Sequence, residues 1–195
     1  TITLALGEAD WAVGYEAANR LVERLLPAAL NSVPLPLGQG RSPAARAAFF
    51  LGEEQYRRAS FEEAMAHYRA ALEADSTFTY AALRAAQAAS WLNKAPEAAA
   101  LLESAGPRLD SLPPKYSAFA RGLLAYQQGH ADTAIARFRA VLDIDPASVE
   151  GWMALGEVYA HLLPHAGSID SLAEHAFTQV RRLDSSFAPA LPHLV

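Results

Sequence analysis

The chain contains no cysteine among its 195 residues. Without thiols it can form no disulfide framework and can offer no thiolate nucleophile or metal ligand. This absence excludes a small disulfide-stapled scaffold and thiol chemistry. It fits the cytosol and an oxidising compartment equally well.

An excess of positive charge is also missing. Lys and Arg together number 16 against 21 Asp and Glu, which gives a net charge of -5, and the sequence has no basic run. Nucleic-acid-binding proteins usually carry a basic patch or stripe, so we expect no nucleic-acid partner. No apolar run approaches the roughly 18 to 20 residues needed to cross a bilayer, so we expect no direct membrane insertion by these residues.

Motifs that carry chemistry are absent as well. Of the six histidines only His161 and His165 lie close together, and Pro164 makes a regular helical pair of them unfavourable. The glycines at 38 and 40 lack the strand-to-helix context of a phosphate loop, and no serine lies in a nucleophile-elbow motif. We therefore predict no catalytic residue, no metal site and no cofactor, and we do not expect an enzyme.

What the sequence does contain is a pattern of small and large apolar residues, first seen over residues 45–78. Two amphipathic runs are separated there by a break at 58–60, and the second run repeats apolar residues at helical spacing. This pattern predicts a helix, a turn and a second helix. Ser60 followed by Glu63 predicts a capping box at the start of the second helix.

The same pattern returns three more times. A small residue in the first helix recurs at spacings of 34, 36 and 34 residues, by subtraction of its positions: Gly52, Ala86, Gly122 and Gly156. An alanine in the second helix recurs at spacings of 34, 36 and 39 residues, and a large apolar residue follows it by four: Ala64, Ala98, Ala134 and Ala173, with Tyr68, Leu102, Phe138 and Phe177. A period of this size is typical of a solenoid of helical hairpins.

At this point the chain resembles the tetratricopeptide repeat (TPR) family. One unit carries the whole first-helix signature, Trp152-x-x-Leu155-Gly156-x-x-Tyr159, and another carries Ala134-x-x-x-Phe138 with Pro146 closing the unit. The resemblance implies an all-α, right-handed α-solenoid of about four TPR-like hairpins. It departs from the family pattern where Gln55 and Ala125 occupy the tyrosine position, and in the second unit, where alanines fill the first-helix signature.

The predicted organisation has four parts. Residues 1–30 form an N-terminal segment with a capping helix, which could alternatively pair with an upstream domain, and residues 31–44 form a Pro- and Gly-containing linker. Residues 45–187 form the repeats (45–78, 79–114, 115–148 and 149–187), with five additional residues in the last turn around 163–167. Residues 188–195 begin a truncated or capping helix. Because the chain starts at Thr1 rather than Met, we expect it to be a piece of a longer polypeptide or a processed product.

In stacked hairpins the first helices line the concave side, and two neighbouring stripes of residues face it. The predicted groove contains Phe49, Glu53, Tyr56, Arg57, Arg84, Gln87, Trp91, Phe119, Leu123, Tyr126, Met153 and Glu157. We expect Tyr56, Trp91, Phe119 and Tyr126 to supply apolar contacts, and Arg57 and Arg84 to pair with acidic groups of a partner. Alternatively, aromatic residues such as Phe50, Tyr80 and Tyr116 only pack adjacent first helices together.

Family members that bind acidic C-terminal tails of chaperones use a clamp of Lys and Asn residues on these first helices. The corresponding positions here hold Phe49, Glu53, Arg84, Tyr116 and Ala120, so we do not expect a chaperone-tail receptor.

The sequence therefore predicts a protein-interaction scaffold that binds a partner peptide in its concave groove. The arrangement of the linker, the repeats and the extended last turn is similar in style to the C-terminal TPR regions of large bacterial signalling proteins. That resemblance implies a soluble docking or sensory part of a regulatory protein, either cytoplasmic or periplasmic. Two alternatives remain open: a self-assembly module that forms homo-oligomers, and a sensor domain for a small molecule or lipid.

Overall fold

The computed structural model describes residues 41–185, and in them all regular structure is helical. The helices are α2 (Pro43–Arg57), α3 (Phe61–Ala74), α4 (Thr79–Trp91), α5 (Ala95–Ala105), the 3₁₀ helix η1 (Gly106–Ser111), α6 (Pro114–Gln127), α7 (Ala131–Ile144), α8 (Val149–His161) and α9 (Gly167–Leu183). The predicted capping helix, most of the predicted linker and the helix predicted after residue 187 lie outside the described residues.

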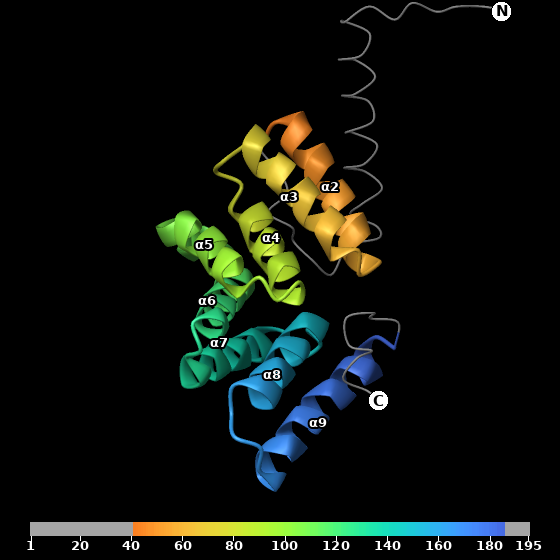
Figure 1. The fold of residues 1–195 in the computed structure, drawn as a ribbon, viewed down its shortest axis with the longest axis vertical. Helices are drawn as coiled ribbons and strands as arrows, with labels where there is room; N and C mark the ends of the chain where they lie inside the picture. Colours follow the sequence, from red (N-terminus) through yellow and green to blue (C-terminus); the bar gives the residue numbers. More distant parts are fainter. Residues whose placement is uncertain (1–40, 186–195) are drawn as a thin grey trace, which may run out of the picture. The chain divides into compact units, whose positions relative to one another are not determined.

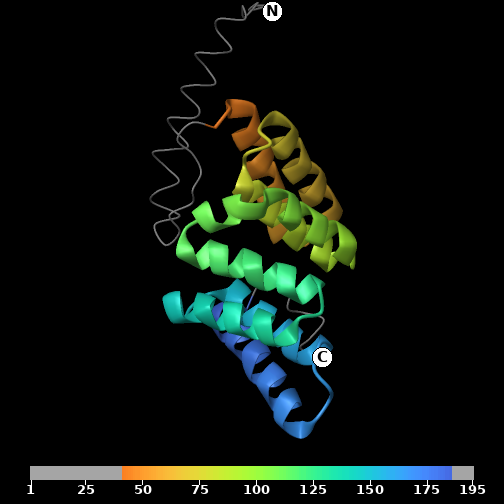
Figure 2. The same ribbon diagram turned by 90° about the vertical axis from the view of Figure 1, so that its left-hand side faces the viewer.

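The helices pack in consecutive pairs. Helix α2 packs on α3, α4 on α5, α6 on α7 and α8 on α9, and each second helix also contacts the first helix of the next pair. Figures 1 and 2 show the pairs following one another from α2 and α3 to α8 and α9. The prediction of an all-α solenoid of helical hairpins is confirmed for these residues.

Close contacts between a glycine and an aromatic ring explain the repeated small residue. A Cβ atom built on Gly52 would lie 2.5 Å from Cε1 of Tyr68, so the ring of α3 lies directly against the backbone of α2. The same contact recurs between Gly122 and Phe138 and between Gly156 and Phe177. In the second hairpin the ring is replaced by Leu102, and the facing position is Ala86 rather than glycine; both are fully buried.

Three of the four hairpin turns end their first helix in the same way. Ala59, Asn93 and Gly129 have φ values of 59°, 57° and 75°. In the first turn the amides of Ala59 and Ser60 donate to the carbonyls of Tyr56 and Gln55, both at 3.0 Å, which is the hydrogen-bond pattern of a Schellman motif. This geometry reverses the chain in three residues and brings the second helix back along the first.

The capping box predicted at Ser60 is wrong. The Ser60 side chain makes no capping hydrogen bond to α3, because this residue belongs to the turn and its amide closes the Schellman motif. Helix α2 does begin with a side-chain cap, since the Ser42 hydroxyl accepts a hydrogen bond from the amide of Ala45 at 3.1 Å and Pro43 opens the helix.

The fourth hairpin accommodates its additional residues in two places. The connection between α8 and α9 comprises residues 162–166, five residues where the other three connections have three, and α9 has 17 residues where α3 and α7 have 14 each. Part of the predicted loop insertion is therefore an additional turn of helix.

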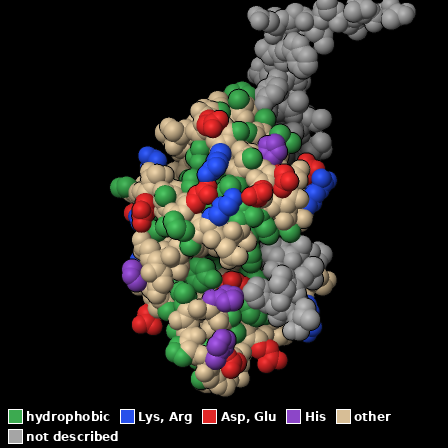
Figure 3. All heavy atoms as spheres, in the orientation of Figure 1, with side chains coloured by type: hydrophobic (Ala, Val, Ile, Leu, Met, Phe, Trp, Pro, Cys, Tyr) green, Lys and Arg blue, Asp and Glu red, His purple; other side chains and the backbone are tan. Residues whose placement is uncertain are grey.

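The surface carries mixed charge. On the face that Figure 3 shows, blue Lys and Arg side chains lie beside red Asp and Glu side chains, with hydrophobic side chains between them. Across residues 41–185, no helix combines the length and the apolar character that spanning a bilayer requires.

Candidate functional site

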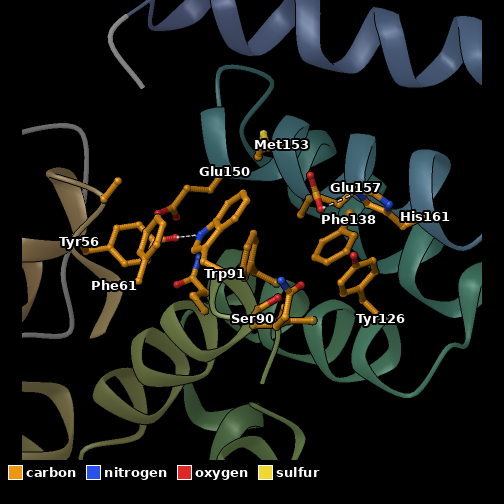
Figure 4. Close-up of a pocket in the computed structure, with 16 residues that line it drawn as sticks. Tyr56, Phe61, Ser90, Trp91, Tyr126, Phe138, Glu150, Met153, Glu157 and His161 are labelled. Atoms are coloured by element: carbon orange, nitrogen blue, oxygen red, sulfur yellow. Dashed lines mark hydrogen bonds and ion pairs between the residues drawn. The ribbon is translucent and has the colours of Figure 1, made fainter. Parts of the chain in front are cut away.

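The first helices α2, α4, α6 and α8 surround a pocket of about 620 Å³, called the inner pocket below (Figure 4). Eight of the residues predicted to face the groove line it: Tyr56, Gln87, Trp91, Phe119, Leu123, Tyr126, Met153 and Glu157. The remaining lining residues are Ala59, Phe61, Ser90, Asn93, Phe138, Glu150, Ala154 and His161. All four hairpins therefore contribute to one cavity.

Three aromatic side chains form one side of the inner pocket, at the left of Figure 4. The rings of Phe61 and Trp91 stack with centroids 5.6 Å apart and an interplanar angle of 16°, and Tyr56 meets Phe61 edge-on at 5.4 Å. The indole Nε1 of Trp91 donates a hydrogen bond to the Tyr56 hydroxyl at 2.8 Å. Because these contacts hold Trp91 and Phe61 in place, this side offers a rigid apolar wall.

A buried ion-pair network lies behind that wall and is centred on Arg84. Its guanidinium donates two hydrogen bonds to Glu53, at 2.6 and 3.2 Å, one to Gln87 at 2.9 Å and one to Glu150 at 2.6 Å. The guanidinium also lies 4.0 Å from the centroid of the Tyr56 ring. Since Glu53 belongs to α2 and Glu150 to α8, this one residue connects the first, second and fourth hairpins.

The environment of Arg84 keeps it charged. Its side chain is only 4% exposed, and burial alone disfavours the cation, but the carboxylates of Glu53 and Glu150 raise the pKa of Arg84 above its ordinary range. Burial also raises the pKa of Tyr56, so its hydroxyl remains a neutral donor and acceptor.

The structure gives Arg84 a role different from the predicted one. We expected its guanidinium to pair with acidic groups of a partner, but its hydrogen bonds go to side chains of the chain itself. The sequence pattern placed it correctly on the inner side of α4, yet could not show that α2 and α8 supply two carboxylates there.

Three other predicted groove residues do not line the inner pocket. Phe49 is fully buried, and its ring packs 5.1 Å from Phe78 and 5.6 Å from Tyr68. Glu53 pairs with Arg84 and accepts a hydrogen bond from the Tyr68 hydroxyl at 2.6 Å. Arg57 is exposed at the last turn of α2. Phe49 is therefore a core residue, Glu53 a network residue and Arg57 a surface residue.

The aromatic residues Tyr80 and Tyr116 pack first helices together. Their rings meet at 4.9 Å in an edge-on arrangement, and only 6% and 7% of their surfaces are exposed. Neither lines the inner pocket. For these two residues the packing alternative that the sequence left open is the one the structure shows.

The other side of the inner pocket, at the right of Figure 4, is polar and acidic. Glu157 of α8 accepts a hydrogen bond from the Tyr126 hydroxyl of α6, and its Oε2 lies 3.5 Å from Nε2 of His161. The Glu157 side chain is 17% exposed, and burial raises its pKa from 4.5 to about 7. Burial also raises the pKa of Tyr126 to about 12, with the negative charge of Glu157 as a second cause.

Sequence reasoning missed two pocket residues that matter for its chemistry. Glu150 lies three residues before Met153 on the same helical stripe, so extending the predicted stripe by one turn would have included it. Phe61 begins α3, a second helix that was expected to lie on the outer side, and no spacing argument places it in the pocket. In residues 41–185 no group of three or more His, Asp or Glu residues is arranged to hold a metal ion.

Comparisons with known proteins identify the fold. No family model and no curated protein matches the chain. Among solved structures it is similar to MamA residues 41 to the end from Desulfovibrio magneticus RS-1, with 16% identity over 93% of this chain and 98% of that chain and a TM-score of 0.50. A MamA RS-1 double mutant matches with 15% identity, the same coverage and a TM-score of 0.48. YrrB, described as a TPR protein with an unusual peptide-binding site, matches with 18% identity over 92% and 98% and a TM-score of 0.39. At 16% identity the match with a TM-score of 0.50 concerns the fold alone, and it agrees with the all-α solenoid of helical hairpins described above.

Proposed function

We propose that residues 41–185 form a protein-interaction module whose inner pocket receives a peptide segment of a partner protein. The observation that carries this proposal is a cavity of about 620 Å³ on the first helices, lined by side chains from all four hairpins, with Phe, Tyr and Trp rings from the first three. A solenoid with a rigid, aromatic inner surface is suited to holding another chain, because buried aromatic anchors dominate protein interfaces.

The polar side chains of the inner pocket suit a peptide. Ser90 and Asn93 of the second hairpin and Glu157 and His161 of the fourth are among the residues that line it. A peptide in the pocket carries its own amides and carbonyls, which must find hydrogen-bond partners when they lose water. The polar side chains that line the inner pocket can supply such hydrogen-bond partners beside its aromatic wall.

The proposal is tested with a phage-displayed library of random 12-residue peptides selected on the purified chain. A pocket-filling variant, Ala154→Trp, should abolish binding of the selected peptides, because Ala154 lines the pocket and an indole there would occupy it. The matched control is Ala70→Trp on α3, an exposed position outside the pocket, which should bind normally. Selected peptides that bind Ala154→Trp as well as the parent chain would contradict the proposal.

The same preparation addresses the two alternative functions. Light scattering behind size-exclusion chromatography at several concentrations detects self-assembly, and native mass spectrometry detects a co-purified small molecule or lipid. A monomer without a bound ligand agrees with the peptide-binding proposal. A stable oligomer that Ala154→Trp disrupts would replace it with self-assembly.

A further inference from the structure

The charged groups of the inner pocket are unequal in sign. Glu150 and Glu157 line it, no Lys or Arg does, and His161 is the one basic side chain among its lining residues. Glu150 already shares the guanidinium of Arg84 with Glu53, so two carboxylates are matched by one cation. With Glu157 added, the described residues in and behind the pocket carry more negative than positive charge.

Aromatic rings lie on both sides of this acidic interior. Tyr126 donates its hydroxyl to Glu157 on one side, and Trp91 stacks on Phe61 on the other (Figure 4). The faces of Trp and Tyr rings attract cations, most strongly where water is displaced. Carboxylates beside aromatic faces therefore favour a cationic guest and disfavour an anionic one.

We propose that the inner pocket selects a basic side chain, Lys or Arg, of the partner peptide, with Glu157 as its ion-pair partner and Tyr126 and Trp91 as aromatic walls. This inference rests on the proposed function, since it names the chemistry of the peptide bound there. The expected guest is therefore basic, and not acidic as Arg57 and Arg84 had suggested, because neither of these residues lines the pocket and the guanidinium of Arg84 is held by glutamates of the chain.

The position of Glu157 favours this role. The carboxylate is largely buried, which makes its ionisation costly, and an incoming ammonium or guanidinium group offsets that cost. Its neighbours within the fold are the neutral hydroxyl of Tyr126 from α6 and the half-exposed imidazole of His161 from its own helix. A basic guest would supply the carboxylate with a cationic partner.

The test uses peptides from the library described above, synthesised with a fluorophore and measured by fluorescence anisotropy. The selected sequences should share a Lys or Arg, and replacing a shared Lys by norleucine should weaken binding to the parent chain roughly tenfold to a hundredfold, as expected for a charge-assisted hydrogen bond. The Glu157→Gln variant keeps the side-chain volume and removes the charge. On that variant the same replacement should change affinity less than about twofold.

Glu73→Gln, at an exposed position of α3, is the matched control and should behave like the parent chain. Peptides that bind, are blocked by Ala154→Trp and share no basic residue would overturn this inference and leave the proposed function standing. If the norleucine replacement weakens binding equally on the parent chain and on Glu157→Gln, this inference is also overturned, because another part of the chain would then bind the basic residue. If no peptide is blocked by Ala154→Trp, the proposed function itself fails.

Discussion

Replacing Glu157 by glutamine should raise the free energy of unfolding of the chain, and the size of this increase should depend on pH. The pKa of this carboxyl is about 7 in the folded chain against 4.5 for an ordinary glutamate, and burial is the largest cause. Well below pH 4.5 the carboxyl is protonated in both the folded and the unfolded chain, so it does not change the free energy of unfolding. As the pH rises, the unfolded chain ionises first and becomes favoured, until the folded carboxyl also ionises near pH 7.

The size of the effect follows from the shift. A difference of 2.5 between 7 and 4.5 corresponds to about 3 kcal/mol, since each pKa unit is worth about 1.4 kcal/mol. Glutamine carries no ionisable group, so Glu157→Gln avoids this penalty. The variant should match the parent chain at pH 4.5 and exceed its free energy of unfolding by about 3 kcal/mol at pH 8.5.

The assay is urea unfolding followed by circular dichroism for both chains at pH 4.5, 6, 7 and 8.5. Because His161 lies 3.5 Å from Glu157 and histidine can carry a charge, the series is repeated in a His161→Gln background. The exposed Glu73→Gln variant is the matched control. A difference between Glu157→Gln and the parent chain that is the same at pH 4.5 and 8.5 would refute the reasoning.

Three further substitutions, two of them paired with a control variant, test the fold. Gly122→Ala should destabilise by about 1 to 3 kcal/mol, because its Cβ would lie 2.7 Å from a buried ring; Gly167→Ala, whose Cβ would meet nothing within 4 Å, should not destabilise in the same thermal melts. Ala59→Gly should raise the free energy of unfolding in urea by about 1 kcal/mol, since Ala59 has a φ of 59° that favours glycine. Arg84→Ala should cost about 3 kcal/mol by leaving buried carboxylates unmatched, whereas the exposed Arg58→Ala should cost less than about 0.5 kcal/mol in the same measurement.

The hairpin fold could be predicted because its determinants repeat along the chain. A glycine or alanine in each first helix faces a ring or leucine in the second, and this pair recurs at nearly constant spacing, so each unit supports the interpretation of the others. The break predicted at 58–60 is the turn between α2 and α3, but the capping box predicted at Ser60 was wrong. The Schellman motif depends on a left-handed residue, Ala59, which a residue pattern does not reveal when it is not glycine.

The inner pocket was only partly predictable, for a different physical reason. Helical spacing decides which residues face inward, and Trp91, Tyr126 and Glu157, which it predicted to face the groove, line the pocket. It does not decide which inward residues meet one another across the solenoid. Arg84 and Glu150 are 66 residues apart, and their pairing at 2.6 Å depends on how far the stacked hairpins turn between α4 and α8.

That pairing in turn sets the chemistry offered to a guest. A guanidinium pointing freely into the cavity would attract carboxylates, as Arg84 was expected to do. Because Glu53 and Glu150 hold the guanidinium, Arg84 connects the hairpins, and the acidic side chains Glu150 and Glu157 line the cavity with no Lys or Arg among the lining residues. The preference of the inner pocket for a basic guest is thus a consequence of the same network that ties the first, second and fourth hairpins together. Arg84→Ala should therefore weaken the fold and, by freeing two carboxylates, leave the pocket more acidic rather than less.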